Sequence, residues 1–191
     1  KTKVIQVMNK DLSIISEKIK LAELLEKWKQ TRRAFSIIPN NLGGYSAISG
    51  RKLLEIGANC TTNLTISELP QKEVTTFDLN DTMRDIINLM LEKNTRKLRL
   101  KNTNNFISDR LIIQTVAQDL NFFRNTTFLD QKIKKSFKLE EAKKISKDVN
   151  LAEISKIMYG MLHPYIFFQD QVITPWDICM ALQSDRIEFL G

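Results

Sequence analysis

A long run of apolar residues at helical spacing is the feature that most constrains the fold of this 191-residue chain. Between Asp11 and about Ile38, apolar side chains recur every three or four positions: Leu12, Ile15, Ile19, Ala22, Leu25 and Trp28. This spacing puts them on one face of an α-helix, and that face must be buried. Pro39 and the pair Gly43-Gly44 end the pattern. The sequence therefore predicts a long amphipathic helix over 11–38.

Other segments add helix starts and a few short strands. Asn150 with Glu153, and Thr174 with Pro175 and Asp177, have the residue types that cap a helix at its N-terminus. Strict alternation over 97–101 predicts a short strand, and the polar residues 169–171 between two apolar runs predict a hairpin. No internal repeat is visible. We predict a mainly α fold with a few short β-strands, either a helical bundle or a winged-helix-like α+β fold.

The chain changes character near its middle. Residues 59–77 are rich in β-prone and turn-forming residues, and Pro70 interrupts them. We predict an N-terminal long-helix segment over 1–58, a connecting loop with short strands over 59–77, and a helical C-terminal subdomain over 78–191. A single compact domain is the alternative, because a chain of this length buries about 70 % of its surface without a disulfide or metal.

The composition excludes several classes of site. One His and two isolated cysteines, Cys60 and Cys179, cannot form a Cys₂His₂ or Cys₄ zinc site. The motifs of serine hydrolases, zinc proteases, P-loop proteins and dinucleotide-binding proteins are absent from the sequence. We assign no catalytic residue, metal ligand or cofactor, and predict a protein that is not an enzyme. The cysteine usage predicts an intracellular location, nuclear or cytoplasmic. No apolar run approaches the roughly 18 residues of a membrane-spanning helix, so we predict no membrane partner.

The net charge of +7 comes from 29 Lys and Arg against 22 Asp and Glu, and the cations are clustered. Clustered cations bind polyanions by releasing counterions, whereas solvated helix faces are the structural alternative. The candidate nucleic-acid contacts are Arg32, Arg33, Arg96, Lys97, Arg99, Lys101, Lys132, Lys134, Lys135 and Lys138.

One segment resembles the start of a helix-turn-helix. Residues 114–122 carry a small Ala117, then Leu120, then Asn121 where the turn begins. The second helix would cover 128–138 and present its lysines to a groove, with either 97–101 or the hairpin near Gln169 as a wing. Ordinary helix packing is the alternative explanation.

Several apolar stripes are too wide for burial on one side. Both a partner contact and burial on two sides within the chain account for such width. The candidate interface residues are Ile15, Leu21, Leu24, Leu25, Trp28, Phe122 and Phe167. We predict a protein partner or a homo-oligomer.

These observations lead to three functional hypotheses. The first is a non-enzymatic assembly module of an intracellular complex associated with nucleic acid. The second is a winged-helix or helix-turn-helix protein that binds DNA directly. The third is an enzyme of a type that the sequence does not reveal.

Overall fold

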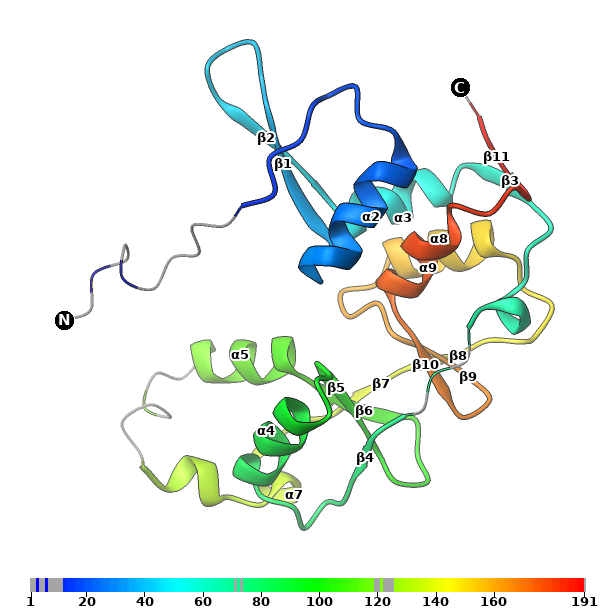
Figure 1. Cartoon of the computed structure of the whole chain (residues 1–191). Coiled ribbons are helices and arrows are strands. Elements are labelled where there is room, and N and C mark those ends of the chain that lie inside the picture. Colours follow the sequence, from blue (N-terminus) through cyan, green and yellow to red (C-terminus); the bar gives the residue numbers. More distant parts are fainter. Residues whose placement is uncertain are drawn as a thin grey trace. The chain divides into compact units, whose positions relative to one another are not determined.

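The structure is a computed structural model that describes residues 3, 6, 12–70, 72, 74–118, 121 and 126–190, without the side chains of residues 126, 135 and 136. Helices and strands alternate along these residues (Figure 1). The helices are α2 (Leu21–Thr31), α3 (Gly50–Gly57), α4 (Met83–Glu92), α5 (Asp109–Gln118), α7 (Ile133–Ser136), α8 (Leu151–Tyr159) and α9 (Pro175–Ala181), with 3-10 turns η1 (Ile66–Glu68) and η2 (Thr126–Asp130). The strands are β1 (Phe35–Pro39), β2 (Tyr45–Ser49), β3 (Cys60–Thr62), β4 (Thr76–Phe77), β5 (Lys97–Leu100), β6 (Asn105–Ser108), β7 (Glu140–Glu141), β8 (Lys143–Lys144), β9 (Ile166–Phe168), β10 (Gln171–Ile173) and β11 (Ile187–Phe189).

A helix–hairpin–helix arrangement recurs three times: α2–β1–β2–α3, α4–β5–β6–α5 and α8–β9–β10–α9. Each hairpin is antiparallel. The first strand of each hairpin also pairs in parallel with a short segment that precedes the first helix: Ile14 with Ile37, β4 with β5, and β8 with β9. The chain therefore contains a structural repeat, although its sequence shows none.

The helix caps explain where several of these elements begin. Asn150 accepts a hydrogen bond from the backbone of Glu153 at 2.9 Å, as predicted. Thr174 and Asp177 form a capping box, with Pro175 in the first turn. Both predicted helix starts and the hairpin around 169–171 are confirmed. These signals are readable because a cap and its partner lie only three residues apart.

The chain forms two compact units, each assembled from separate segments. Unit 1 contains residues 1–69, 147–164 and 174–191, and unit 2 contains residues 70–146 and 165–173. The third repeat is divided, because α8 and α9 belong to unit 1 whereas β9 and β10 belong to unit 2. The predicted division into 1–58, 59–77 and 78–191 stays a prediction.

Unit 1 is organised around α3, which packs against α8 and α9. Leu53 and Leu54 on α3 are buried, and so are Ile154 and Met158 on α8. At Gly57 the helices approach so closely that a Cβ atom would lie 2.7 Å from Ser155 Oγ. Small residues therefore set the spacing of α3 and α8.

Unit 2 contains a four-stranded sheet in the order β4-β5-β6-β7 and a three-stranded sheet in the order β10-β9-β8. One apolar cluster joins Leu98 and Ile107 of the first sheet to Met83 and Ile86 of α4. A second cluster includes Phe106 of the same sheet together with residues of the second sheet, among them Phe167 and Val172. The four-stranded sheet thus contributes side chains to two cores, which holds its strands in one register.

The fold is mixed α/β, and the predicted mainly α fold, as a helical bundle or a winged-helix-like protein, is wrong. The helix predicted over 11–38 is reduced to α2, since Arg32 turns left-handed at φ 54° and β1 follows. Ile37 pairs with Ala47 across the hairpin and with Ile14 in a bridge. These distant pairings outweigh the local helical period. Asp11 lies outside the described residues.

The predicted helix-turn-helix is also wrong, and with it the winged-helix and DNA-binding assignments. Residues 128–138 do not form one recognition helix, because only η2 and the four-residue α7 lie in this region. Phe128 and Ile133 are buried in unit 2. The proposed wing, 97–101, contains β5, which is an interior strand between β4 and β6. Leu120 and residues 122–125 lie outside the described part of the chain.

Candidate functional site

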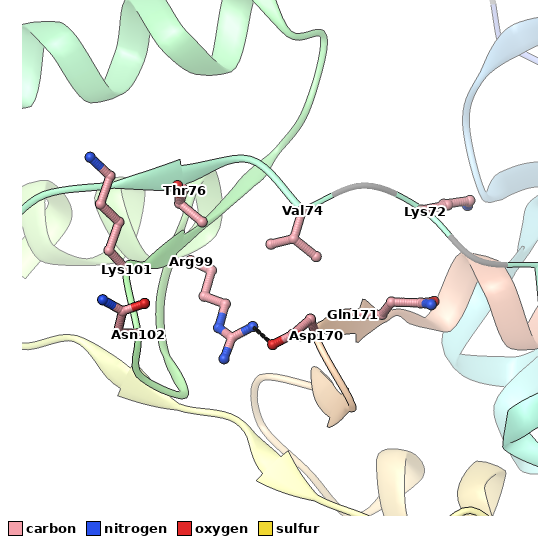
Figure 2. Close-up of a pocket in the computed structure, with 8 residues that line it drawn as sticks. All are labelled: Lys72, Val74, Thr76, Arg99, Lys101, Asn102, Asp170 and Gln171. Carbon is pink, nitrogen blue, oxygen red and sulfur yellow. Dashed lines mark hydrogen bonds and ion pairs between the residues drawn. The ribbon is translucent and has the colours of Figure 1, made fainter.

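A pocket of about 690 Å³ opens in unit 2 beside the four-stranded sheet (Figure 2). Both polar and apolar side chains line it, and three of the lining residues are cationic. The described lining residues are Lys72, Val74, Thr76, Arg99, Lys101, Asn102, Asp170 and Gln171.

The pairing of β4 with β5 places most of these residues. Thr76 lies opposite Arg99 in the parallel register, and the backbone N–H of Arg99 donates to Thr75 O at 3.0 Å. One step further, Lys101 N donates to Phe77 O at 3.1 Å. Asp170 comes from the turn between β9 and β10, far away in the sequence. The pocket therefore exists only when the two sheets of unit 2 are formed.

Arg99 is the best-anchored cation of the pocket. Its Nε donates to Thr103 O at 2.6 Å, and its Nη1 donates to Asp170 Oδ1 at 3.1 Å. Its guanidinium carbon lies 4.6 Å from the centre of the buried Phe167 ring. Only 14 % of the Arg99 side chain is exposed. A ligand would therefore meet a guanidinium group whose orientation is already set.

The electrostatic character of the pocket is cationic. Among the described lining residues, Lys72, Arg99 and Lys101 are cationic and Asp170 is acidic, and the Arg99 guanidinium is the group that points at Asp170 (Figure 2). In the turn that follows β4, the pKa of the Asp78 carboxyl lies below its usual value. The main cause is the hydrogen bond from the backbone of Asn80, and the nearby charge of Lys101 adds to the shift. Such a pocket can hold an anionic group by charge-assisted hydrogen bonds.

The described residues do not suggest a metal centre. No group of three or more His, Cys, Asp or Glu side chains among them is arranged to hold a metal ion. Cys60 and Cys179 are both free and buried. Burial raises the pKa of the Cys179 thiol to about 12, so this thiol is protonated at neutral pH.

Of the ten cations predicted from sequence, Arg99 and Lys101 are the two that line the pocket in the described part of the chain. Arg96 forms an ion pair with Asp109, and the Lys97 ammonium lies 5.8 Å from the Tyr165 ring centre. The remaining candidates are exposed on unit 1, Arg32 and Arg33, or on unit 2, Lys132, Lys134 and Lys138. The side chain of Lys135 is not among those that the structure describes.

Most of the predicted interface residues are buried within their own unit. The exposed fractions are 3 % for Ile15, 2 % for Leu24 and Phe167, and 0 % for Leu25 and Trp28. Leu21 is half-buried, and Phe122 lies outside the described residues. Burial within the chain, the alternative that the sequence left open, accounts for the buried residues. The participation of these seven residues in a partner contact stays a prediction.

Sequence reasoning missed the acidic and amide residues of the pocket. The sequence pattern places Asp170 only in the turn of the predicted hairpin, and it assigns no role to Asn102. Both turns contain a left-handed residue, with φ 57° at Asn102 and 53° at Gln169. The local sequence signals a turn at each place. It does not signal that the two turns meet.

The sequence matches no protein-family model, and a search of curated proteins gives no match. Two solved structures share the fold over 93 % of this chain. One is a protein from Methanocaldococcus jannaschii, described as a candidate archaeal homolog of γ-AMPK, with 15 % identity, a TM-score of 0.72 and 69 % of that chain covered. The other is an uncharacterized conserved protein from Pyrococcus horikoshii, with 10 % identity, a TM-score of 0.66 and 82 % of that chain covered.

A CBS-domain protein from Agrobacterium tumefaciens matches 63 % of this chain at 12 % identity, with a TM-score of 0.49 and 94 % of that chain covered. At such identities the comparisons establish the fold alone, a mixed α/β fold shared with the proteins from Methanocaldococcus jannaschii and Pyrococcus horikoshii. They provide no evidence for DNA binding. No helix in the described part of the chain is both long and apolar enough to cross a membrane.

Proposed function

We propose that the chain is a regulatory module that binds an anionic small molecule, a nucleotide phosphate in the first instance, in the pocket of unit 2. The observation that carries the proposal is the pre-oriented Arg99 beside Lys101, at the edge of a pocket large enough for a small ligand. CBS-domain proteins, which this fold resembles, often bind adenosine ligands. That likeness supports nucleotides as the first ligands to test.

Each part of such a ligand has a counterpart in the pocket. A phosphate group can accept hydrogen bonds from the Arg99 guanidinium, and the exposed Lys101 side chain, which points away from Arg99 in Figure 2, can turn its ammonium toward the same ligand. Val74 and the Thr76 methyl group offer apolar contact, while Asn102 and Gln171 offer amide donors and acceptors. This division between a few polar groups and an apolar wall is typical of small-molecule sites.

Substitution of Lys101 tests the proposal directly. Lys101 is exposed, so Lys101→Gln is expected to leave the fold intact and to weaken binding of AMP, ADP or ATP about fivefold to tenfold. Isothermal titration calorimetry on the whole chain at low salt measures the affinity. Lys138→Gln is the matched control, because Lys138 is an exposed lysine of unit 2 that does not line the pocket. Failure of all three nucleotides to bind at millimolar concentration would contradict the proposal.

Three further predictions, on catalysis, assembly and location, accompany this proposal. We expect no catalytic activity, because CBS-domain proteins are generally regulatory rather than catalytic. We expect a protein partner or a homo-oligomer, because a regulatory module acts by changing its interaction with another protein when its ligand binds. An intracellular location is expected because nucleotides are held inside cells. Size-exclusion chromatography with light scattering, with and without nucleotide, measures the oligomeric state.

A further inference from the structure

The ion pair between Arg99 and Asp170 joins two very different side chains. Arg99 is held by Thr103 and Phe167 and is 14 % exposed, whereas the Asp170 side chain is 97 % exposed. Asp170 lies at the tip of the β9–β10 turn, next to the left-handed Gln169. Figure 2 shows the carboxylate reaching the guanidinium at the edge of the pocket. Arg99, the cation, is therefore anchored in its position, whereas Asp170, the anion, is easily released.

An exposed carboxylate of this kind is a weak occupant of its position. Among the described residues, Asp170 forms its ion pair with Arg99. Ion pairs that are exposed to solvent contribute little to stability. A phosphate can take two parallel hydrogen bonds from one guanidinium, which a single carboxylate oxygen at 3.1 Å does not use. A ligand phosphate therefore competes for Arg99 on favourable terms.

We infer that Asp170 is an internal competitor for Arg99 and determines which anions the pocket accepts. This inference rests on the proposed function, because it requires the pocket to bind an anion. A monoanion that replaces the Asp170 carboxylate exchanges one negative charge for another and gains little. A phosphomonoester dianion brings a second charge for Lys101. The pocket therefore selects phosphomonoester dianions over monoanions.

The charge of the ligand gives the first test. The second pKa of a phosphomonoester is about 6, so AMP changes from monoanion to dianion between about pH 5 and pH 7. Binding of AMP should strengthen over this range, whereas the methyl ester of AMP, a monoanion throughout, should bind weakly and without this rise. Equal affinities for the two compounds at pH 7.5 would overturn the selectivity.

Removal of the Asp170 charge gives the second test. Asp170→Asn should bind AMP about fivefold more tightly than the wild type, which equals about 1 kcal/mol at 1.4 kcal/mol per tenfold change. Asp130→Asn is the matched control. Asp130 forms an exposed ion pair with Arg84 at 3.0 Å, also in unit 2, and does not line the pocket. Both variants lose one negative charge, but only the first removes the competitor.

The outcomes separate this inference from the proposed function. The inference is supported if Asp170→Asn binds AMP more tightly than Asp130→Asn does. It is also supported if Asp170→Asn binds AMP while the wild type and Asp130→Asn do not. Binding by the wild type that Asp170→Asn leaves unchanged or weakens overturns the inference and leaves the proposed function standing. Absence of binding by the wild type and by both variants overturns both.

A double-variant comparison tests whether the effect passes through Arg99. In an Arg99→Lys background the fork-like guanidinium is lost while the charge is kept, so Asp170→Asn should change AMP affinity less than twofold. Thermal unfolding of each variant checks that the fold is retained. A full fivefold gain in the Arg99→Lys background would show that Asp170 acts on another group and would overturn the inference.

Discussion

At the scale of single residues, Glu68 shows how one ion pair can join distant parts of unit 1. Arg186 forms an ion pair with Glu68, and its Nε donates to Asn63 Oδ1 at 2.7 Å. The Arg186 hydrogen bond, followed by the backbone N–H of Thr65, holds the pKa of Glu68 at about 2. The side chain of Arg186 therefore ties the segment before β11 to the segment that follows β3.

This pKa predicts an acid dependence with a defined sign. A carboxylate whose pKa is lowered by folding stabilises the protein above its unfolded pKa, near 4.5, and loses that contribution as the pH falls toward 2. The wild type should therefore lose more thermal stability than Glu68→Gln between pH 6 and pH 3. Differential scanning calorimetry across this range measures the difference. Glu26→Gln, in an exposed pair with Lys29, is the control, and parallel curves for the wild type and Glu68→Gln would contradict the prediction.

At the scale of elements, the contact between α3 and α8 depends on the missing side chain of Gly57. A Cβ atom there would lie 2.7 Å from Ser155 Oγ and 3.2 Å from Leu182 Cδ2. Ser155 is fully buried, and its hydroxyl donates to Leu151 O at 2.7 Å. The hydroxyl cannot move away without losing this hydrogen bond, so α3 and α8 would have to separate.

Gly57→Ala should therefore destabilise the protein, although alanine favours helices more than glycine does. We expect a loss of about 1–3 kcal/mol, the usual effect of overpacking a core, measured by urea denaturation. Gly160→Ala is the control, because a Cβ atom there would meet nothing closer than Ile157 O at 3.6 Å. The combined change Gly57→Ala with Ser155→Ala should recover part of the loss. Equal stability of the two glycine variants would refute this explanation.

At the scale of the whole molecule, the net charge of +7 attracts any anion, so specific binding must be separated from general attraction. The pocket predicts saturation at one AMP per chain. Because the Debye length falls to about 10 Å at 0.1 M salt, added sodium chloride should weaken this binding without changing the stoichiometry. Equilibrium dialysis at 20 mM and 200 mM salt measures both quantities. Several weak sites that vanish together at high salt would indicate general attraction.

The sequence alone determined the features that depend on near neighbours. It predicted the caps at Asn150 and Thr174 and the hairpin around 169–171, because the residues that form each of them lie within a few positions. It also identified Arg99 and Lys101 as part of a cationic cluster. Alternation predicted the strand at 97–101, where β5 lies, but periodicity failed for the fold class, because strands of two to five residues offer few positions in which a period can show.

Only the tertiary structure decided the sheet pairings, the repeat and the pocket. Ile14 joins Ile37, and β8 joins β9, through backbone hydrogen bonds that carry no mark in the side-chain pattern. Asp170 meets Arg99 because two sheets of unit 2 form around shared cores. Local sequence specifies conformation through neighbouring side chains. The partner of a short strand, and the opposite wall of a pocket, are chosen by burial and hydrogen bonding between segments far apart in the chain.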